Sequence, residues 1–213
     1  RANEGKSRFL AAASHDLRQP LQTLAMLNGT LRRLATDLQV AEVVAHQGQA
    51  IAAMSRLLNT LLDISKLESG AVKAEVTDFR VASLFDELRE EFAGLAASKG
   101  LELRVEDCAE TVHSDPSLVG QILKNLVSNA IKYTCEGWVQ LRCLHQQSWV
   151  RIEVLDTGVG IPADQLGHIF DEFYQVGVAP NTTRDGYGLG LSIVDRLARL
   201  LGARVDVESE PGK

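Results

Sequence analysis

Apolar residues in the first third of the chain recur at alternating steps of four and three residues. The first series of such positions is Leu17, Leu21, Leu24, Asn28, Leu31, Ala35 and Leu38. A second series is Gln47, Ala50, Met54, Leu57, Leu61, Ile64 and Leu67. This heptad spacing is typical of helices that pack lengthwise against one another. We therefore predict one helix over about 7–37 and a second through 47–67, which together form an αα-hairpin.

The two predicted helices carry more apolar surface than one antiparallel partner can cover. Apolar residues that lie outside the two series include Phe9, Leu10, Leu27, Leu34, Leu58 and Leu62. A hairpin of this kind usually completes its core by pairing with a copy of itself in a four-helix bundle. The helical pattern breaks at 68–70, where Glu-Ser-Gly follows. We place a domain boundary there, with one domain over 1–68 and another over 69–213.

Beyond residue 70 the pattern changes to a mixture of helices and strands. Alternation predicts strands over about 74–80, 101–105, 138–144, 149–155 and 204–208. Amphipathic helices are predicted over 82–98, from 115–116 onward, and over about 188–201. Asp115 and Pro116 suit the cap and the first position of the second of these helices. The fold class predicted is a helical hairpin followed by an α+β domain.

Composition narrows the possible partners of the chain. Its 213 residues carry a net charge of −6, which argues against a broad nucleic-acid surface. The three cysteines show no C-x-x-C pairing, as expected in a reducing compartment. No apolar run approaches the roughly 20 residues of a membrane span, so we expect no membrane contact. The abrupt start at RANEGKSRF suggests a fragment of a longer protein.

The segment QILKNLVSNAIKYT at 121–134 places polar side chains on one helical face. Gln121, Asn125, Asn129 and Lys132 are spaced by four, four and three residues. Amide oxygens can bind a hard cation, and a lysine can bind phosphate. A face that is simply solvated would explain the same spacing, and this segment alone leaves both interpretations open.

Two glycine-containing segments follow. In VLDTGVGIP at 154–162, Asp156 ends an apolar strand and could accept a hydrogen bond from an amino group such as that of adenine. A plain turn and the D-T-G of aspartic proteases are alternatives. In RDGYGLGLSIV at 184–194, a glycine-rich loop leads into a helix N-terminus, an arrangement that binds phosphate.

The segment SHDLRQPL at 14–21 places His15 five residues before Pro20 within the first predicted helix. Proline cannot donate a hydrogen bond to the carbonyl of Asp16, four residues back, so a bend is expected there. An ordinary histidine on a helix surface is the alternative interpretation.

Together, and in this order, these segments resemble the sensor histidine kinases of two-component systems. SHDLRQPL resembles the phospho-acceptor motif of their dimerisation domain. The other three segments, with FDEFYQ at 170–175, resemble the motifs of the Bergerat-type ATP-binding domain, an α/β sandwich. The resemblance covers essentially the whole chain. It implies a homodimeric four-helix bundle followed by a catalytic domain.

The resemblance also implies a mechanism and a set of site residues. His15 would attack the γ-phosphorus of ATP, with Asp16 acting as a base toward it. Asn129, supported by Asn125, would coordinate Mg²⁺. The residues implied to bind nucleotide are Asn125, Asn129, Lys132, Tyr133, Asp156, Gly158, Gly160, Ile161, Gly186, Gly188, Leu189 and Gly190. Residues 171–190 would form a mobile lid, in which Arg184 is either a γ-phosphate contact or a solvated side chain.

The partner implied is a response-regulator receiver domain, whose aspartate would take the phosphoryl group. The resemblance also implies cytoplasmic localisation, as part of a longer membrane-anchored or soluble sensor. Three departures from the family pattern stand out: Tyr187 replaces a frequent threonine, Gln19 stands where Asn or Thr accompanies phosphatase activity, and ESEPGK lacks the usual final glycine turn and strand.

Two other functions remain open at this point. One is a signalling scaffold that binds nucleotide without transferring a phosphoryl group. The other is a Bergerat ATPase that hydrolyses ATP, although such enzymes activate water with a glutamate where this chain has Asn125.

Overall fold

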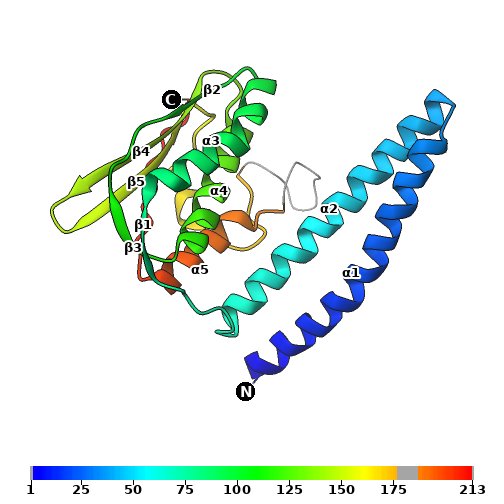
Figure 1. The fold of residues 1–213 in the computed structure, drawn as a ribbon, viewed down its shortest axis with the longest axis horizontal. Coiled ribbons are helices and arrows are strands. Elements are labelled where there is room, and N and C mark those ends of the chain that lie inside the picture. The colour runs from blue at the N-terminus through cyan, green and yellow to red at the C-terminus, as the bar shows by residue number, and fades with distance from the viewer. Residues whose placement is uncertain (1, 177–186, 213) are drawn as a thin grey trace. The chain divides into compact units, whose positions relative to one another are not determined.

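The computed structural model describes residues 2–176 and 187–212, with the side chains of 2–16 outside that description. The chain divides into two compact units, Arg1–Lys73 and Ala74–Lys213. Figure 1 labels the helices and strands along the chain.

The first unit is a hairpin of two long helices, as the heptad pattern predicted. Helix α1 spans Ala2–Leu34 and helix α2 spans Leu38–Glu68 (Figure 1). Asp37 caps α2, since its side chain accepts hydrogen bonds from Gln39 N (2.8 Å) and Val40 N (3.2 Å). The α1 helix continues through Pro20, the only proline within it. The turn between the two helices is short and covers only 35–37, because α1 ends at Leu34 and α2 begins at Leu38.

A buried polar contact joins the two helices of the hairpin. Asn28 lies in the apolar series of α1 and is 8% exposed. Its Nδ2 donates hydrogen bonds to Val44 O (2.8 Å) and Gln47 Oε1 (3.2 Å) on α2. A Cβ at Gly48 would lie 2.8 Å from Asn28 Oδ1, so a glycine lets the amide sit there. Asn28 is thus satisfied within the hairpin itself.

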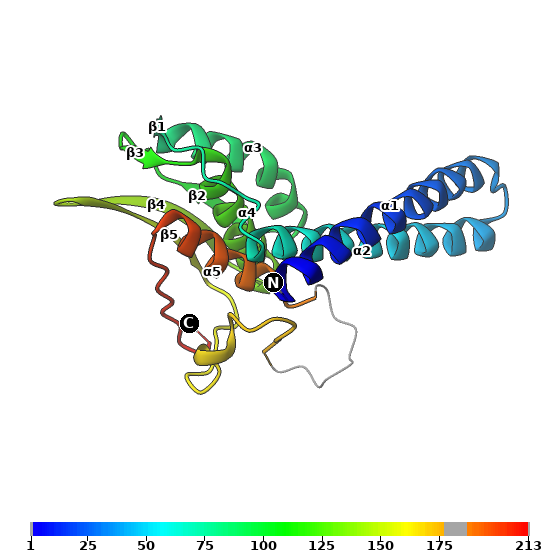
Figure 2. The same cartoon turned by 90° about the horizontal axis from the view of Figure 1, so that it is seen from below.

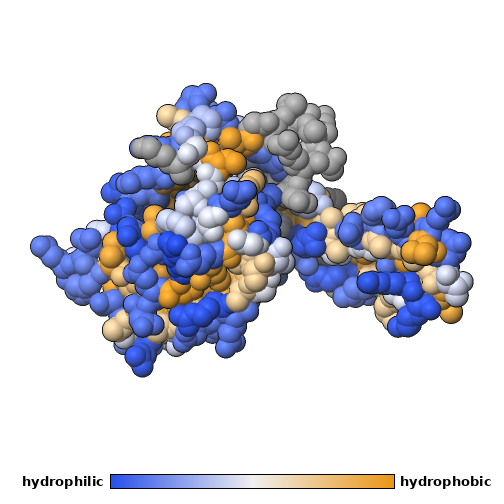
Figure 3. Space-filling view, turned by 90° about the horizontal axis from the view of Figure 1, so that it is seen from above, coloured by the Kyte–Doolittle hydropathy of each residue, from blue (hydrophilic) through white to orange (hydrophobic). Residues whose placement is uncertain are grey.

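Much of the apolar surface of the hairpin remains uncovered in the single chain. Met26, Leu34 and Leu38 are 75%, 70% and 87% exposed, and Leu17, Leu24, Leu27 and Leu31 are exposed as well. Figure 3 shows apolar residues interspersed with polar ones on the visible face of this unit. This surface is of the kind that a second hairpin would cover, as the bundle prediction requires.

In its described residues, the second unit combines two small sheets with three α-helices. Its elements are β1 (Thr77–Arg80), α3 (Val81–Ser98), β2 (Glu102–Val105), β3 (Thr111–Ser114), α4 (Pro116–Tyr133), β4 (Trp138–Gln146), β5 (Trp149–Asp156), the 3₁₀ turn η1 (Leu166–His168) and α5 (Gly190–Leu201). Strands β1 and β3 pair antiparallel. Strand β4 lies between β2, its parallel partner, and β5, its antiparallel partner.

Helices α3, α4 and α5 lie on one side of the strands, as Figures 1 and 2 show. The core lies where α3 and α4 meet the three-stranded sheet. Its fully buried members include Phe85, Leu88, Val127, Ile131, Val139 and Leu141. This packing fixes α4, which carries Asn125, Asn129, Lys132 and Tyr133, against β4 and β5, and β5 ends at Asp156.

The N-terminal cap of α4 is the one that the sequence predicted. Asp115 Oδ1 accepts hydrogen bonds from Ser117 N (2.9 Å) and Leu118 N (3.0 Å), with Pro116 in the first turn. The other oxygen of Asp115 accepts a hydrogen bond from Glu75 N at 2.7 Å. The start of α4 is therefore fixed both to its own first turn and to the segment before β1.

Two strand predictions differ from the structure. The strand β3 was not predicted, because its four residues form a strand only by pairing with β1. The strand predicted over 204–208 is wrong, since these residues are coil and have no ladder partner among the described residues. Apolar alternation alone does not make a strand without a neighbouring strand to accept its hydrogen bonds.

Among the described residues, no helix is both long enough and apolar enough to cross a membrane.

Candidate active site

The polar face of α4 provides one wall of the candidate site. Asn125 and Asn129 are half-buried, whereas the apolar side of the helix, including Val127 and Ile131, lies in the core. Asn125 Nδ2 donates to Gln121 O at 2.9 Å, one turn earlier. This bond commits the amide nitrogen and leaves Asn125 Oδ1 as the outward-facing acceptor.

The last glycine of the second glycine motif packs directly onto this face. A Cβ at Gly190 would lie 3.2 Å from Asn125 Oδ1 and 3.7 Å from Asn129 Nδ2. Gly190 is also the first residue of α5, where backbone N–H groups lack partners within the helix. The fold thus brings the two asparagines and a helix N-terminus together from segments some 60 residues apart.

Asp156 ends β5 beside the start of β4. It is opposite Val139 in the antiparallel register, and its side chain is exposed. Asp156 Oδ1 accepts a hydrogen bond from Gly158 N at 2.9 Å, which turns the chain and leaves the other carboxylate oxygen available. A Cβ at Gly158 would lie 2.6 Å from that Asp156 oxygen and 2.8 Å from Tyr133 O. Only glycine fits where this loop passes the end of α4.

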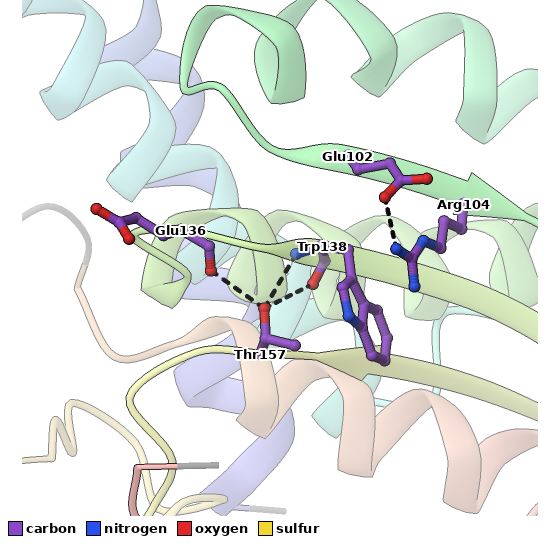
Figure 4. Close-up of polar contacts among 5 residues, drawn as sticks. All are labelled: Glu102, Arg104, Glu136, Trp138 and Thr157. Carbon is purple, nitrogen blue, oxygen red and sulfur yellow. Dashed lines mark hydrogen bonds and ion pairs between the residues drawn. The ribbon is translucent and has the colours of Figure 1, made fainter.

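Thr157 anchors the same loop to the turn that precedes β4. Its Oγ1 accepts a hydrogen bond from Trp138 N (3.0 Å) and donates one to Glu136 O (3.1 Å), as Figure 4 shows. Beside it, Arg104 lies over the Trp138 ring, 4.9 Å from the centroid. Arg104 also donates to Glu102 at 2.5 Å, which lowers the pKa of that carboxyl group. These hydrogen bonds of Thr157 hold the loop against the turn before β4, and so they fix the position of the neighbouring Asp156.

The C-terminal residues run along the outer side of the loop. Ile161 N donates to Ser209 Oγ at 2.8 Å, and Gly212 N donates to Val159 O at 3.1 Å. A Cβ at Gly160 would overlap the carbonyl oxygen of Glu210. Gly160 and Ile161 therefore shape the site through this close approach of two segments.

The phenylalanine motif contacts the second glycine motif through the backbone. Phe173 N donates to Gly188 O at 3.0 Å. Gly188 has φ +68°, and a Cβ there would lie 2.6 Å from Tyr174 O. Arg196 on α5 also forms an ion pair with Glu172. A shallow hollow of about 440 Å³ lies beside these residues, lined by Phe170, Asp171, Glu172, Asp195, Arg196 and Arg199.

Lys132 and Tyr133 lie at the end of the polar face of α4. Lys132 Nζ donates to Tyr133 OH at 3.0 Å and lies 4.6 Å from the centre of the ring. The Tyr133 side chain is 47% exposed, so its ring is open to a ligand. Leu189, by contrast, is only 3% exposed. Any contact of Leu189 with a ligand would have to come from its backbone.

Some predicted site residues lie outside the described part of the chain. These are Gly186 and Arg184, together with residues 177–186 of the expected lid, which is half of it. His15 and Asp16 belong to α1, but their side chains are outside the description. Three residues with contacts at the edge of the site were not singled out in the sequence. Lys99 Nζ donates to Ile131 O and Lys132 O, Thr134 Oγ1 donates to Ala130 O, and Thr157 holds the turn before β4. A Lys-Gly pair at a helix end was the only local signal for the first of them.

Comparison with known proteins matches both units. Residues 5–70 match the His Kinase A (phospho-acceptor) domain. Residues 114–213 match the Histidine kinase-, DNA gyrase B-, and HSP90-like ATPase family. The sensor histidine kinase RcsC of Escherichia coli strain K12 is 33% identical over 99% of this chain, which is 23% of that protein.

The chain belongs to the sensor histidine kinases.

Other relatives agree with this assignment to the sensor histidine kinases. The autoinducer 2 sensor kinase/phosphatase LuxQ of Vibrio cholerae is 35% identical over 97% of this chain and 25% of its own length. The crystal structure of full-length ShkA in complex with AMPPNP has a TM-score of 0.83 and 29% identity, covering 97% of this chain and 43% of ShkA. The AdeS kinase of Acinetobacter baumannii, with a TM-score of 0.66 and 19% identity over 93% of this chain and 92% of AdeS, shares the fold.

This sensor histidine kinase chain spans about a quarter of the length of RcsC and LuxQ. The resemblance drawn from its motifs is confirmed, as is a helical region followed by an α/β ATP-binding domain. Membership of this family removes the aspartic-protease interpretation of the D-T-G at Asp156. The roles of individual residues remain proposals.

Proposed function

We propose that the chain is an ATP-dependent autokinase that phosphorylates its own His15 and passes the phosphoryl group to an aspartate of a receiver domain. The observation that carries the proposal is the convergence of three motifs on the outward face of α4. Gly190 approaches Asn125 and Asn129, while Gly158 approaches Tyr133. These contacts leave polar groups facing a common region next to the N-terminus of α5.

In this proposal each group binds a different part of ATP. The free carboxylate oxygen of Asp156 accepts a hydrogen bond from the adenine amino group, and Tyr133 lies against the nucleotide. Backbone N–H groups at Gly188 and Gly190 face the phosphates at the start of α5, where the helix dipole favours anions. Lys132 supplies positive charge close by.

The asparagine oxygens fit a magnesium ion by their chemistry. Asn125 Oδ1 faces outward because its nitrogen is bonded to Gln121 O, and Asn129 lies one turn further along. Mg²⁺ prefers oxygen ligands and keeps several waters and phosphate oxygens when protein ligands are few. Among the described residues there is no cluster of three or more acidic, histidine or cysteine side chains to hold a metal. The ion would neutralise charge on the phosphates when bound.

The proposed transfer is an in-line displacement at phosphorus. A nitrogen of His15 attacks the γ-phosphorus, the bond to the β-phosphate oxygen breaks, and ADP leaves. Asp16 orients the imidazole and accepts its proton. The phosphohistidine then donates the group to a receiver aspartate. The dimer formed by the hairpins and the use of cytoplasmic ATP belong to the same proposal.

Labelling with γ-³²P ATP and Mg²⁺ tests the autokinase directly. We expect label on the protein that is lost in acid and stable in base, as for phosphohistidine, and that disappears in His15→Gln. An isolated receiver domain added afterwards should take the label. Nucleotide binding without protein label would indicate the scaffold, and free phosphate without protein label would indicate the hydrolytic ATPase.

A further inference from the structure

The C-terminus of α4 has an unusually complete set of hydrogen-bond partners. A helix leaves its last four carbonyl groups without partners inside the helix. Here all four accept hydrogen bonds. Ala130 O accepts from Thr134 N and Oγ1, Ile131 O and Lys132 O accept from Lys99 Nζ, and Tyr133 O accepts from Val159 N.

Lys99, from a different helix, donates hydrogen bonds to two of these four carbonyl groups. Its Nζ lies 2.8 Å from Ile131 O and 3.0 Å from Lys132 O. A positive charge at this end of a helix also interacts favourably with the helix dipole. Lys99 is the C-cap residue of α3, and the chain turns directly after it at Gly100, which has φ +71°. Leu101, which is 6% exposed, then enters the core and fixes this turn.

The carbonyl next to those held by Lys99 belongs to the candidate site. Tyr133 O accepts a hydrogen bond from Val159 N at 3.3 Å, and Gly158 passes close to the same oxygen. The spacing between the end of α4 and the loop carrying Asp156 therefore depends on where residues 131–133 lie. Lys99 itself is exposed, and its contact with Lys132 is to the backbone carbonyl and not to the side chain proposed to face the phosphates.

We propose that Lys99 is a positioning residue for the nucleotide site, acting through the last turn of α4. It holds Lys132 and Tyr133 in register with the loop at Asp156, and thereby sets the affinity for the adenine end of ATP. The inference rests on the proposed function. It adds a determinant of nucleotide affinity that makes no contact with nucleotide.

The contrasting possibility is that Lys99 only joins α3 to α4. Lys124 offers a matched control, because its Nζ joins the same two helices through an ion pair with Glu91 Oε2 at 2.6 Å. Lys124 is exposed on α4, and its side chain is paired with Glu91 on α3. A residue that merely ties the helices together should behave like Lys124.

The test compares Lys99→Met, Lys99→Arg and Lys124→Met in the full chain, at a temperature where thermal melts show all of them folded. Calorimetry gives the Kd for AMP-PNP, and labelling gives KM and kcat for ATP. We expect Lys99→Met to raise both Kd and KM about three- to tenfold, consistent with loss of charged hydrogen bonds. We expect kcat to change less than about twofold, since phosphate and His15 contacts are untouched.

The arginine variant keeps a donor and a charge, so Lys99→Arg should recover most of the affinity. Lys124→Met should leave Kd and KM unchanged. An unaltered Kd in Lys99→Met, or equal rises in Lys99→Met and Lys124→Met, would overturn the positioning role. If Lys99→Met does not fold, Lys99→Gln replaces it, with the same two outcomes. Failure of the unsubstituted chain to bind AMP-PNP would instead overturn the proposed function and this inference with it.

Discussion

At the scale of single residues, the site depends on which atom of a side chain is left free. The spacing of Asn125 and Asn129 along the sequence predicted that both lie on one helical face. It did not predict that Asn125 Nδ2 would be bonded to Gln121 O, which fixes Oδ1 as the available group. Periodicity specifies the direction of a side chain from the helix, whereas the orientation of its amide depends on neighbours.

Replacing Asn129 with aspartate should abolish Mg-ATP-dependent labelling and leave the fold intact. Aspartate has the same shape but adds negative charge beside the phosphates, and position 129 is half-buried on the side of α4 opposite the core. Labelling measures the first effect and circular dichroism the second. Ser128→Ala, at the exposed neighbouring position, should keep full labelling. An unfolded Asn129→Asp variant would mean that Asn129 has a structural role.

The cysteines should differ sharply in reactivity. Burial, and then hydrogen bonding with Cys108, raises the pKa of Cys143 to about 12 from an ordinary value of 9.0. Because the thiolate is the reactive form, only about one Cys143 in ten thousand is reactive at pH 8. Cys135 is exposed. Iodoacetamide at pH 8 should therefore label Cys135 and spare Cys143, as read by peptide mass spectrometry. Equal labelling of both in the folded chain would contradict this, whereas in urea both should react.

At the scale of helices and strands, features that depend on neighbouring residues were easier to predict than features that depend on a partner strand. The cap at Asp115 acts within one turn, so the start of α4 was predicted from neighbouring residues. The cap at Asp37 was not predicted, because the heptad spacing runs on through residues 35–38 and hides the turn between the helices. Strand β3 and the coil at 204–208 depend on whether a partner strand lies alongside. The glycines at 158, 188 and 190 were identified as site residues, but the segments they approach emerge only from the fold.

Adding a methyl group at Gly48 should destabilise the hairpin. The new Cβ would lie 2.8 Å from Asn28 Oδ1, so the amide must shift and weaken its bond to Val44 O. Disturbing a buried polar group costs about 1–3 kcal/mol, more than the roughly 1 kcal/mol that alanine gains over glycine in a helix. Thermal melts followed at 222 nm should therefore show a lower Tm for Gly48→Ala.

Gly29→Ala serves as the control, since no atom lies within 4 Å of a Cβ built there. It should melt at the same temperature as the unsubstituted chain or slightly higher. If Gly48→Ala is as stable as Gly29→Ala, Asn28 does not constrain the packing of α1 on α2.

At the scale of the whole molecule, the two units differ in how completely they bury their own apolar residues. The unit Ala74–Lys213 has a core with fully buried Phe85, Leu88 and Ile131. The hairpin leaves residues such as Leu31 and Leu34 exposed. The heptad series predicted this excess, because more apolar positions were present than one neighbouring helix covers. The series does not predict whether the proposed phosphorylation of His15 would run within or across the protomers of the proposed dimer, which depends on the handedness of the connection between the two helices.

The excess apolar surface predicts how fragments will associate. Residues 1–73 alone should dimerise, and residues 74–213 alone should remain monomeric, because only the hairpin requires a partner to cover its surface. Light scattering measures the mass of each fragment. A monomeric hairpin fragment would count against the four-helix bundle. Self-association of 74–213 would contradict the prediction that the dimer contact lies in the hairpin.

The backbone contact between Phe173 and Gly188 has a consequence for hydrogen exchange. Phe173 has φ +62°, a conformation that costs a non-glycine residue roughly 1–3 kcal/mol, and its side chain is 59% exposed. Little burial therefore compensates for the strain, and its amide is shielded mainly by the bond to Gly188 O. We expect this amide to exchange with deuterium much faster than amides in the middle of α4. The exchange rate of this amide, followed by NMR, would then report how often the hydrogen bond between the two motifs opens. Protection equal to that of the Val127 amide would show that this hydrogen bond stays closed.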